Sequence, residues 1–175
     1  MGYLPHENIE KSRIVPTEYD YLFRGQLIHG YVHDQGAAML GGVGGHAGVF
    51  GNANDLCKIM QMYLNQGEYG EERYLSSEVV KEFTSYQFRK DNNRRGAGFD
   101  KPALEKGGSA CDSVSELSFG HSGFTGTLVW ADPQSEIIYI FLSNRIHPDA
   151  DNRKLITMNI RTDIMQVIYD YLDEK

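Results

Sequence analysis

A short segment in the last third of the chain combines residue types that serve in acyl-transfer chemistry. Residues 120–124 read Gly-His-Ser-Gly-Phe, close to the G-x-S-x-G turn that presents a nucleophilic serine. Phe124 occupies the place of the last glycine, and a second apolar strand, not the helix that such a turn needs, is expected to follow. The pattern therefore argues against Ser122 as a nucleophile.

Two further patterns suggest ligands but lack what those ligands need. His29 and His33 stand four residues apart, yet the glutamate of an H-E-x-x-H motif is missing, Gly30 disfavours a helix, and no third ligand is evident. Residues 42–47, Gly-Val-Gly-Gly-His-Ala, have the glycine spacing of a dinucleotide-binding turn without its adjoining strand and helix. We expect neither a metal nor a cofactor.

Helices are expected where apolar residues recur at helical spacing. One amphipathic helix is predicted from residue 54 to about residue 67. A serine cap at residue 76 or 77 begins a second helix, which ends near residue 85. From residue 151 onward, a single apolar stripe predicts one long terminal helix.

Three apolar segments separated by short, turn-rich spacers predict an antiparallel meander, over residues 117–122, 127–131 and 137–143. Because residues 137–142 are apolar on both alternating faces, we expect this strand to be covered on both sides of the sheet. The fold class is therefore α+β, with an antiparallel sheet of three C-terminal strands packed against helices.

The remaining segments carry no sustained period. Residues 1–35 are expected to form an extended connecting segment with short turns. Residues 36–51 contain seven glycines and are expected to form a shaped loop, and residues 87–117 are expected to be mostly loop.

Composition excludes several classes of protein. A chain of 175 residues and 19.8 kDa is expected to form one domain. A net charge of -7, with no basic cluster longer than Arg94-Arg95, argues against nucleic-acid partners. The longest apolar run, residues 137–142, is too short to span a membrane. Cys57 and Cys111 lack the spacing of a zinc or redox site, and we expect both to be free thiols.

Several segments together carry a family resemblance. In chain order they are residues 13–18, 32–34, 45–50, 54–56, 119–127, 130–133 and 141–145. They resemble the serine β-lactamase-like family. The likeness is greatest to its class C-type esterase and penicillin-binding-protein branch, including copies fused to family 3 glycoside hydrolases such as β-N-acetylglucosaminidases. The segments cover nearly the whole chain in the family's order.

The resemblance assigns roles to the segment described first. The family's chemistry needs an S-x-x-K nucleophile motif, a Y-x-N or S-D-N triplet, and a K-T-G strand, and residues 121–123 stand at the third as an H-x-G variant. This implies that His121 is a hydrogen-bonding or cationic partner of the substrate, and that the Ser122 hydroxyl lies near the substrate's carboxylate or acyl group. It implies that Gly123 lets the substrate lie along the strand edge and that the Phe124 N–H is one of two oxyanion donors. The alternative is a tight β-turn in which His121 is merely a polar surface residue.

The other two motifs are missing from the chain. No serine is followed by lysine three residues later. The triplet Tyr63-Leu64-Asn65 follows the glycine-rich loop, whereas the family places its triplet before that loop, so we expect Tyr63 to pack in the core. We therefore expect residues 1–175 to be a single domain, the C-terminal portion of a β-lactamase-like catalytic domain with an incomplete β-lactamase/transpeptidase-like fold.

Two functions follow as expectations. The first is a fragment of a serine acyl hydrolase for β-lactam, peptidoglycan-peptide or ester substrates, inactive alone and, by the resemblance, extracytoplasmic or periplasmic. The second is a non-catalytic binding or interaction module that retains part of the fold. In the family, two N-terminal strands complete the sheet beside its final strand. Without them, we expect the edge of residues 137–143 either to drive homo-oligomerisation or to be covered by the chain's first segment.

Overall fold

The main sheet is an antiparallel meander in the order β5-β6-β7, formed by β5 (Phe119–Ser122), β6 (Leu128–Asp132) and β7 (Ile137–Phe141). The computed structural model describes residues 1–105 and 107–174. Trp130, at the centre of β6, is paired with Gly120 on one side and Tyr139 on the other. The predicted meander is confirmed, although β7 ends two residues earlier than residue 143.

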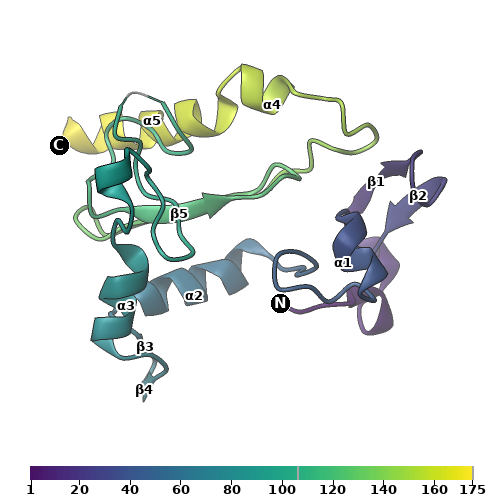
Figure 1. The fold of residues 1–175 in the computed structure, drawn as a ribbon, viewed down its shortest axis with the longest axis horizontal. Coiled ribbons are helices and arrows are strands. Elements are labelled where there is room, and N and C mark those ends of the chain that lie inside the picture. The colour runs from purple at the N-terminus through teal and green to yellow at the C-terminus, as the bar shows by residue number, and fades with distance from the viewer. Residues whose placement is uncertain (106, 175) are drawn as a thin grey trace.

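Helices cover both faces of this sheet (Figure 1). On one face lies α2 (Ala53–Leu64), whose Met60 packs with Phe119 and Ala131. On the other face lies α5 (Ile160–Asp173), and the cluster beneath it contains Leu128, Trp130, Tyr139, Met165 and Tyr169. Ile138 packs with the α2 cluster and Tyr139 with the α5 cluster. The expectation that the strand is covered on both sides is confirmed, as is the α+β class.

The first two predicted helices begin at side-chain caps. Asn52 accepts the Asp55 N–H at 3.0 Å at the start of α2, and Ser76 accepts the Val79 N–H at 3.3 Å at the start of α3 (Ser77–Thr84). The first helix ends three residues before residue 67, because the chain turns into a small hairpin of β3 (Glu68–Tyr69) and β4 (Glu72–Arg73). Tyr63 packs against the Met60 cluster, as expected.

The terminal helix is not continuous from residue 151, so that prediction was wrong. A short α4 (Lys154–Thr157) precedes α5, and Asn159 between them has a left-handed backbone with φ of 50°. Two contacts hold the start of α5 in place. The Tyr139 hydroxyl donates to the Arg161 carbonyl, and the Arg161 side chain donates to the Thr127 carbonyl, both at 3.0 Å. The predicted apolar stripe is also not the face that packs on the sheet, because Ile156, Ile164, Val167 and Tyr171 on that stripe are exposed. The buried residues of α5 are Met165 and Tyr169.

The N-terminal part forms regular structure that was not predicted. Two 3₁₀ turns (Pro5–Glu7 and Lys11–Arg13) precede a hairpin of β1 (Pro16–Asp20) and β2 (Gln26–His29), and the short helix α1 (Gln35–Met39) follows. The expectations of an extended segment over residues 1–35 and of a loop from residue 36 were therefore wrong. The hairpin depends on side-chain hydrogen bonds. The Asp20 carboxylate accepts three backbone N–H groups of its turn, and Asp34 accepts the Ala37 N–H at 2.7 Å to begin α1.

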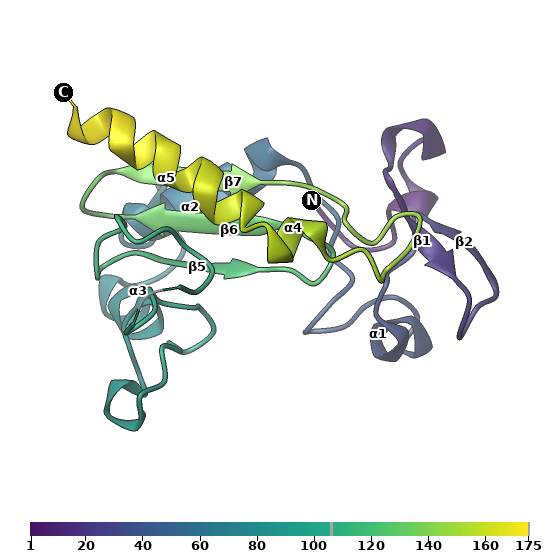
Figure 2. The same ribbon diagram turned by 90° about the horizontal axis from the view of Figure 1, so that it is seen from above.

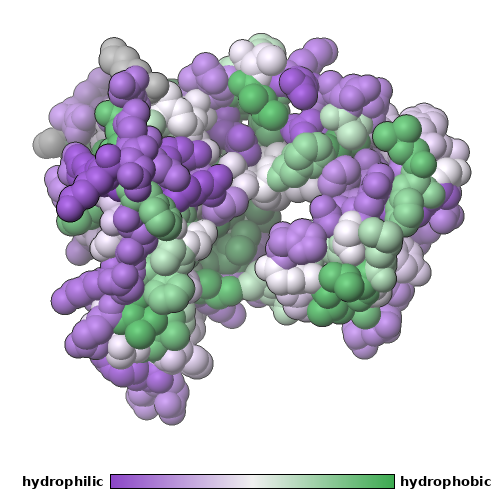
Figure 3. Space-filling view, viewed as in Figure 1, coloured by the Kyte–Doolittle hydropathy of each residue, from purple (hydrophilic) through white to green (hydrophobic). Residues whose placement is uncertain are grey.

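This N-terminal unit lies at one end of the molecule, beside the loop that follows β7 (Figures 1 and 2). The surface is hollowed between the unit and the sheet, and hydrophobic residues lie in the recess (Figure 3). Because β1 and β2 pair with each other, the first segment does not cover β7, and β6 is the sole strand neighbour of β7 in the described chain. The expectation that the first segment covers the edge of β7 is therefore wrong.

The rest of the chain follows the expectations. Between residues 87 and 117, the only regular element in the described part is a 3₁₀ turn, Arg89–Asp91. Cys57 is exposed, Cys111 is buried, and both are free thiols. In residues 1–105 and 107–174, none of the helices has the length and apolar character that a membrane crossing requires.

Candidate substrate-binding site

Gly120 lies where β5 approaches β6 closely, and its hydrogen bonds show which backbone groups of β5 face away from β6. A Cβ atom at this position would lie 2.8 Å from the Trp130 Cα and would also overlap the Val129 carbonyl, so β5 and β6 approach too closely for a side chain. The Gly120 N–H and C=O exchange hydrogen bonds of 3.0 and 2.8 Å with Asp100. The backbone groups of Gly120 therefore point away from β6, and strand alternation gives those of Ser122 the same direction.

Gly123 and Phe124 form the turn that follows this edge. The Gly123 N–H donates to the Thr127 carbonyl at 2.8 Å, and the Gly123 carbonyl accepts the Gly126 N–H at 3.0 Å. Because a trans peptide places its N–H opposite its C=O, the Phe124 N–H points out of the turn. The structure thus brings together the four residues predicted from the sequence, with His121 and Ser122 at the end of β5 and the other two beside them.

His121 is exposed but is held through both ring nitrogens. Nδ1 lies 2.8 Å from the Ser122 carbonyl oxygen, and Nε2 lies 3.0 Å from the Arg95 guanidinium. Arg95 forms an ion pair with Asp100, whose side chain is 2 % exposed, and Arg94 pairs with the same carboxylate at 2.8 Å. Asp100 and Arg95 were not predicted as site residues, because the segment that carries them has no sustained period.

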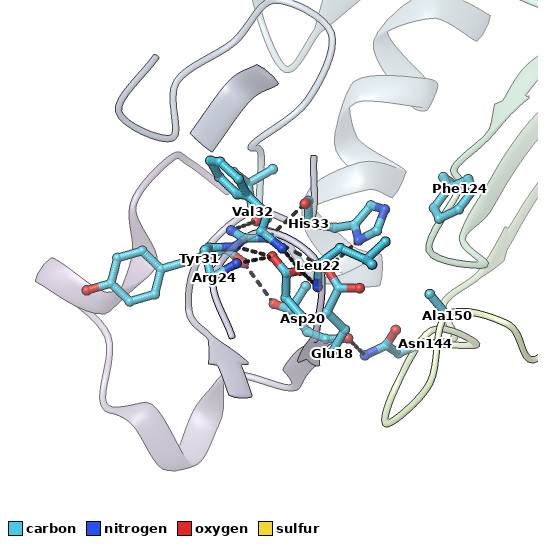
Figure 4. A network of polar contacts seen from close by, with 12 residues as sticks. Glu18, Asp20, Leu22, Arg24, Tyr31, Val32, His33, Phe124, Asn144 and Ala150 are labelled. Atoms are coloured by element: carbon cyan, nitrogen blue, oxygen red, sulfur yellow. Dashed lines mark hydrogen bonds and ion pairs between the residues drawn. The ribbon is translucent and has the colours of Figure 1, made fainter. Parts of the chain in front are cut away.

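The exposed Phe124 ring connects this turn to the N-terminal unit (Figure 4). It stacks on His33 with 4.8 Å between the ring centroids. It also contacts Arg145, whose guanidinium lies 4.4 Å from the Phe124 ring centroid. Nδ1 of His33 is 2.5 Å from the buried Glu18 carboxylate. The Asn144 amide also donates to the Pro16 and Thr17 carbonyls. The turn is therefore positioned by contacts from both parts of the molecule.

An arginine-rich cavity of about 320 Å³ opens beside the turn. Its lining residues are Ser122, Gly123, Phe124, Gly126, Arg145, Arg153, Ile156 and Arg161. Arg145 is held in place by donating to the Phe124, Ala150 and Asn152 carbonyls. Burial, together with the nearby charge of Arg145, lowers the pKa of Arg161. Among the described residues that line this cavity, three are cationic and none is acidic, which suits an anionic group.

These three arginines were not predicted as site residues. They lie in three different segments, namely the loop after β7, the approach to α4, and α5, so no period within one element relates them. Of the three, Arg145 alone lies in a segment that carried the family resemblance, residues 141–145.

Comparison with known proteins places the chain in a family. The sequence profile of the Beta-lactamase family matches residues 6–160. A protein of Escherichia coli K12 provisionally named D-alanyl-D-alanine carboxypeptidase is 36% identical over 165 residues, which covers 85% of this chain and 37% of that protein. The protein of the same name in Escherichia coli O157:H7 is 34% identical over the same length and with the same coverage.

A solved structure supports the fold. The crystal structure of a β-lactamase from Mycobacterium bovis superposes with a TM-score of 0.53 at 19% identity, over 70% of this chain and 46% of that one. The likeness extends to part of that fold. The chain spans little more than a third of the length of the curated relatives, at 37%. With a family match over most of its residues and a partial β-lactamase-like fold, the chain belongs to the β-lactamase family.

Proposed function

We propose that residues 1–175 form the C-terminal, substrate-binding portion of one serine acyl-hydrolase domain. The observation that carries this proposal is the outer edge of β5 beyond Gly120, where Ser122 and the Phe124 turn adjoin the arginine-lined cavity. The name shared by the two Escherichia coli relatives favours peptidoglycan-type peptides as the substrate class. β-Lactams and esters are related acyl donors, and we include them as assay substrates.

In this proposal, the substrate lies along the edge of β5 with its reacting carbonyl at the turn. The Phe124 N–H donates to the oxygen that becomes negatively charged in the transition state, because a fixed donor stabilises developing charge better than reorganising water does. The resemblance gave Gly123 the role of leaving room for the substrate, but a Cβ there would overlap the Thr127 hydroxyl, so the glycine serves the turn itself. The Ser122 hydroxyl lies near the substrate's carboxylate or acyl group. A carboxylate on the leaving side meets the arginines of the cavity.

The nucleophile does not come from this chain. No serine here has lysine three residues later, so we propose that S-x-x-K and the Y-x-N triplet belong to the two thirds of the relatives' length that the chain does not match. The chain alone is then inactive. A peptidoglycan-type substrate would place the assembled enzyme outside the cytoplasm. We extend the proposal to no particular fusion partner.

The proposal is tested by complementation. The chain is assayed with nitrocefin and a p-nitrophenyl ester, alone and joined to an N-terminal family segment that carries S-x-x-K and Y-x-N. We expect no turnover by the chain alone, turnover by the joined protein, and loss of turnover on His121→Ala in a variant whose circular dichroism is unchanged. Turnover by the chain alone would contradict the missing nucleophile. A joined, folded protein that binds substrate without turnover would favour the non-catalytic binding module.

A further inference from the structure

We propose that Arg95 is a positioning residue that holds the His121 imidazole in the tautomer with its hydrogen on Nδ1. In this arrangement the Arg95 guanidinium is the positive charge beside the ring at the end of β5. The consequence for substrate binding rests on the proposed function, whereas the tautomer itself follows from the contacts of the ring.

The two hydrogen bonds of His121 specify one tautomer. The Ser122 carbonyl oxygen can only accept, so Nδ1, 2.8 Å away, carries the hydrogen. The Arg95 guanidinium can only donate, so Nε2, 3.0 Å away, provides a lone pair. The opposite tautomer would place an N–H of the ring against the guanidinium and a lone pair against the carbonyl oxygen. The tautomer with its hydrogen on Nδ1 is therefore the one that satisfies both partners.

The guanidinium is fixed to the same strand as the ring it contacts. Asp100 forms ion pairs with Arg95 and Arg94, and its backbone exchanges two hydrogen bonds with Gly120, the residue before His121. With its carboxylate 2 % exposed, Asp100 is a rigid anchor and not a mobile surface charge. The contact network around His121 contains three charged residues, namely Asp100, Arg94 and Arg95. Because it holds two guanidinium groups and one carboxylate, its net charge is positive.

This arrangement bears on the roles that the family resemblance allows for His121. Because both ring nitrogens are engaged, by Ser122 and by Arg95, the imidazole borders the substrate edge as an aligned group that supports Arg95. The Arg95 side chain is 49% exposed, and a guanidinium has five N–H donors, of which those on Nη1 face His121 and Asp100.

The test is the tautomer of His121, measured by two-bond ¹H–¹⁵N correlation NMR on the ¹⁵N-labelled chain. Spectra are recorded at pH 8, above the ordinary imidazole pKa of about 6.5, and the His121 signals are assigned by their loss in His121→Gln. We expect a pyridine-like shift for Nε2 and a pyrrole-like shift for Nδ1. In Arg95→Met, both nitrogens should move toward the averaged values of exchanging tautomers, and Arg95→Lys should restore the wild-type pattern.

Arg94→Met is the matched control, because Arg94 binds the same carboxylate without contacting His121. It should leave the His121 signals unchanged. A wild-type ring protonated on Nε2, an Arg95→Met spectrum identical to the wild type, or an equal effect of Arg94→Met would each overturn the proposal. None of these results depends on turnover, so a failure of the proposed hydrolase activity is distinguished from a failure of this inference.

Discussion

Lys101 shows how one buried side chain makes stability depend on pH. The residue is 2 % exposed, its ammonium donates to the Leu117 carbonyl at 2.9 Å, and it lies over the rings of Tyr86 and Phe119. No carboxylate forms an ion pair with it in the described chain. Burial therefore lowers the pKa of Lys101 to about 8, from an ordinary value of 10.5.

The sign of the effect follows from proton binding. Between pH 8 and 10.5, the unfolded chain keeps the Lys101 proton while the folded chain loses it, so the free energy of unfolding rises with pH through this window. We predict that the stability of the wild type relative to Lys101→Met increases from pH 7.5 to pH 9.5, by at most about 1.4 kcal/mol per pH unit. Urea unfolding of both proteins at each pH measures this difference in the free energy of unfolding.

The exposed Lys81→Met variant is the control, since it makes the same substitution at a lysine that is not buried. Comparing variants at the same pH cancels the titration of the other groups. A difference in the free energy of unfolding between the wild type and Lys101→Met that stays constant with pH would show that Lys101 is charged throughout.

At the scale of elements, the β5-β6 pair depends on the missing side chain at residue 120. We predict that Gly120→Ala lowers the free energy of unfolding by about 1–3 kcal/mol, because a methyl group would overlap the backbone of β6 at Val129 and Trp130. Urea denaturation measures the loss. Gly45→Ala is the matched control, since a Cβ there meets nothing within 4 Å. Equal effects of the two substitutions would contradict the close approach of the strands.

The elements that the sequence predicted are those with local chemical signals. The meander could be predicted from compact apolar segments and short turns, α2 from its helical apolar spacing, and α3 from its cap Ser76. The cap of α2 is Asn52, whereas Asn54 and Asp55 were expected in that role. The break at Asn159 could not, because helical spacing of apolar residues is the same with or without a left-handed residue between two helices. The buried face of α5 was also missed, since Met165 and Tyr169 lie off the predicted stripe and the stripe residues Ile164 and Val167 are exposed.

The N-terminal hairpin escaped prediction because its buried residues are polar. Three polar residues of β1, Thr17, Glu18 and Asp20, are buried. Their hydrogen-bond partners are Tyr31, His33 and Arg24, which come from later in the chain. A hydrophobic pattern cannot reveal such a strand. The same reason applies to the candidate site. The motif identified His121 through Phe124, but Asp100 and the arginines reach it through tertiary contacts that no local period encodes.

At the scale of the whole molecule, two unpartnered apolar features lie together. Gly120 pairs with Trp130, and Trp130 pairs with Tyr139. Because the backbone groups of Gly120 point away from β6, those of Tyr139 point toward β6. The N–H groups of Ile138 and Ile140 therefore lie on the open edge of β7. The neighbouring helix α5 crosses the sheet (Figure 2) and has exposed apolar residues on its outer side, namely Ile164, Val167, Ile168 and Leu172. An open strand edge beside an apolar helix face favours association with another chain.

We therefore predict that this chain, by itself, self-associates through β7 and α5 with a second copy. Sedimentation velocity should show an average mass that rises with concentration, and hydrogen exchange at Ile138 and Ile140 should slow in parallel.

Val167→Lys, at a side chain that is 68% exposed, should weaken association because it places a charge in the contact. Val79→Lys on α3, where the side chain is 42% exposed, is the control and should have no effect. A monomer at every concentration, or equal effects of the two lysines, would show that this surface does not join two copies. Joining the N-terminal family segment should abolish the association, since two strands beside β7 would occupy the same edge.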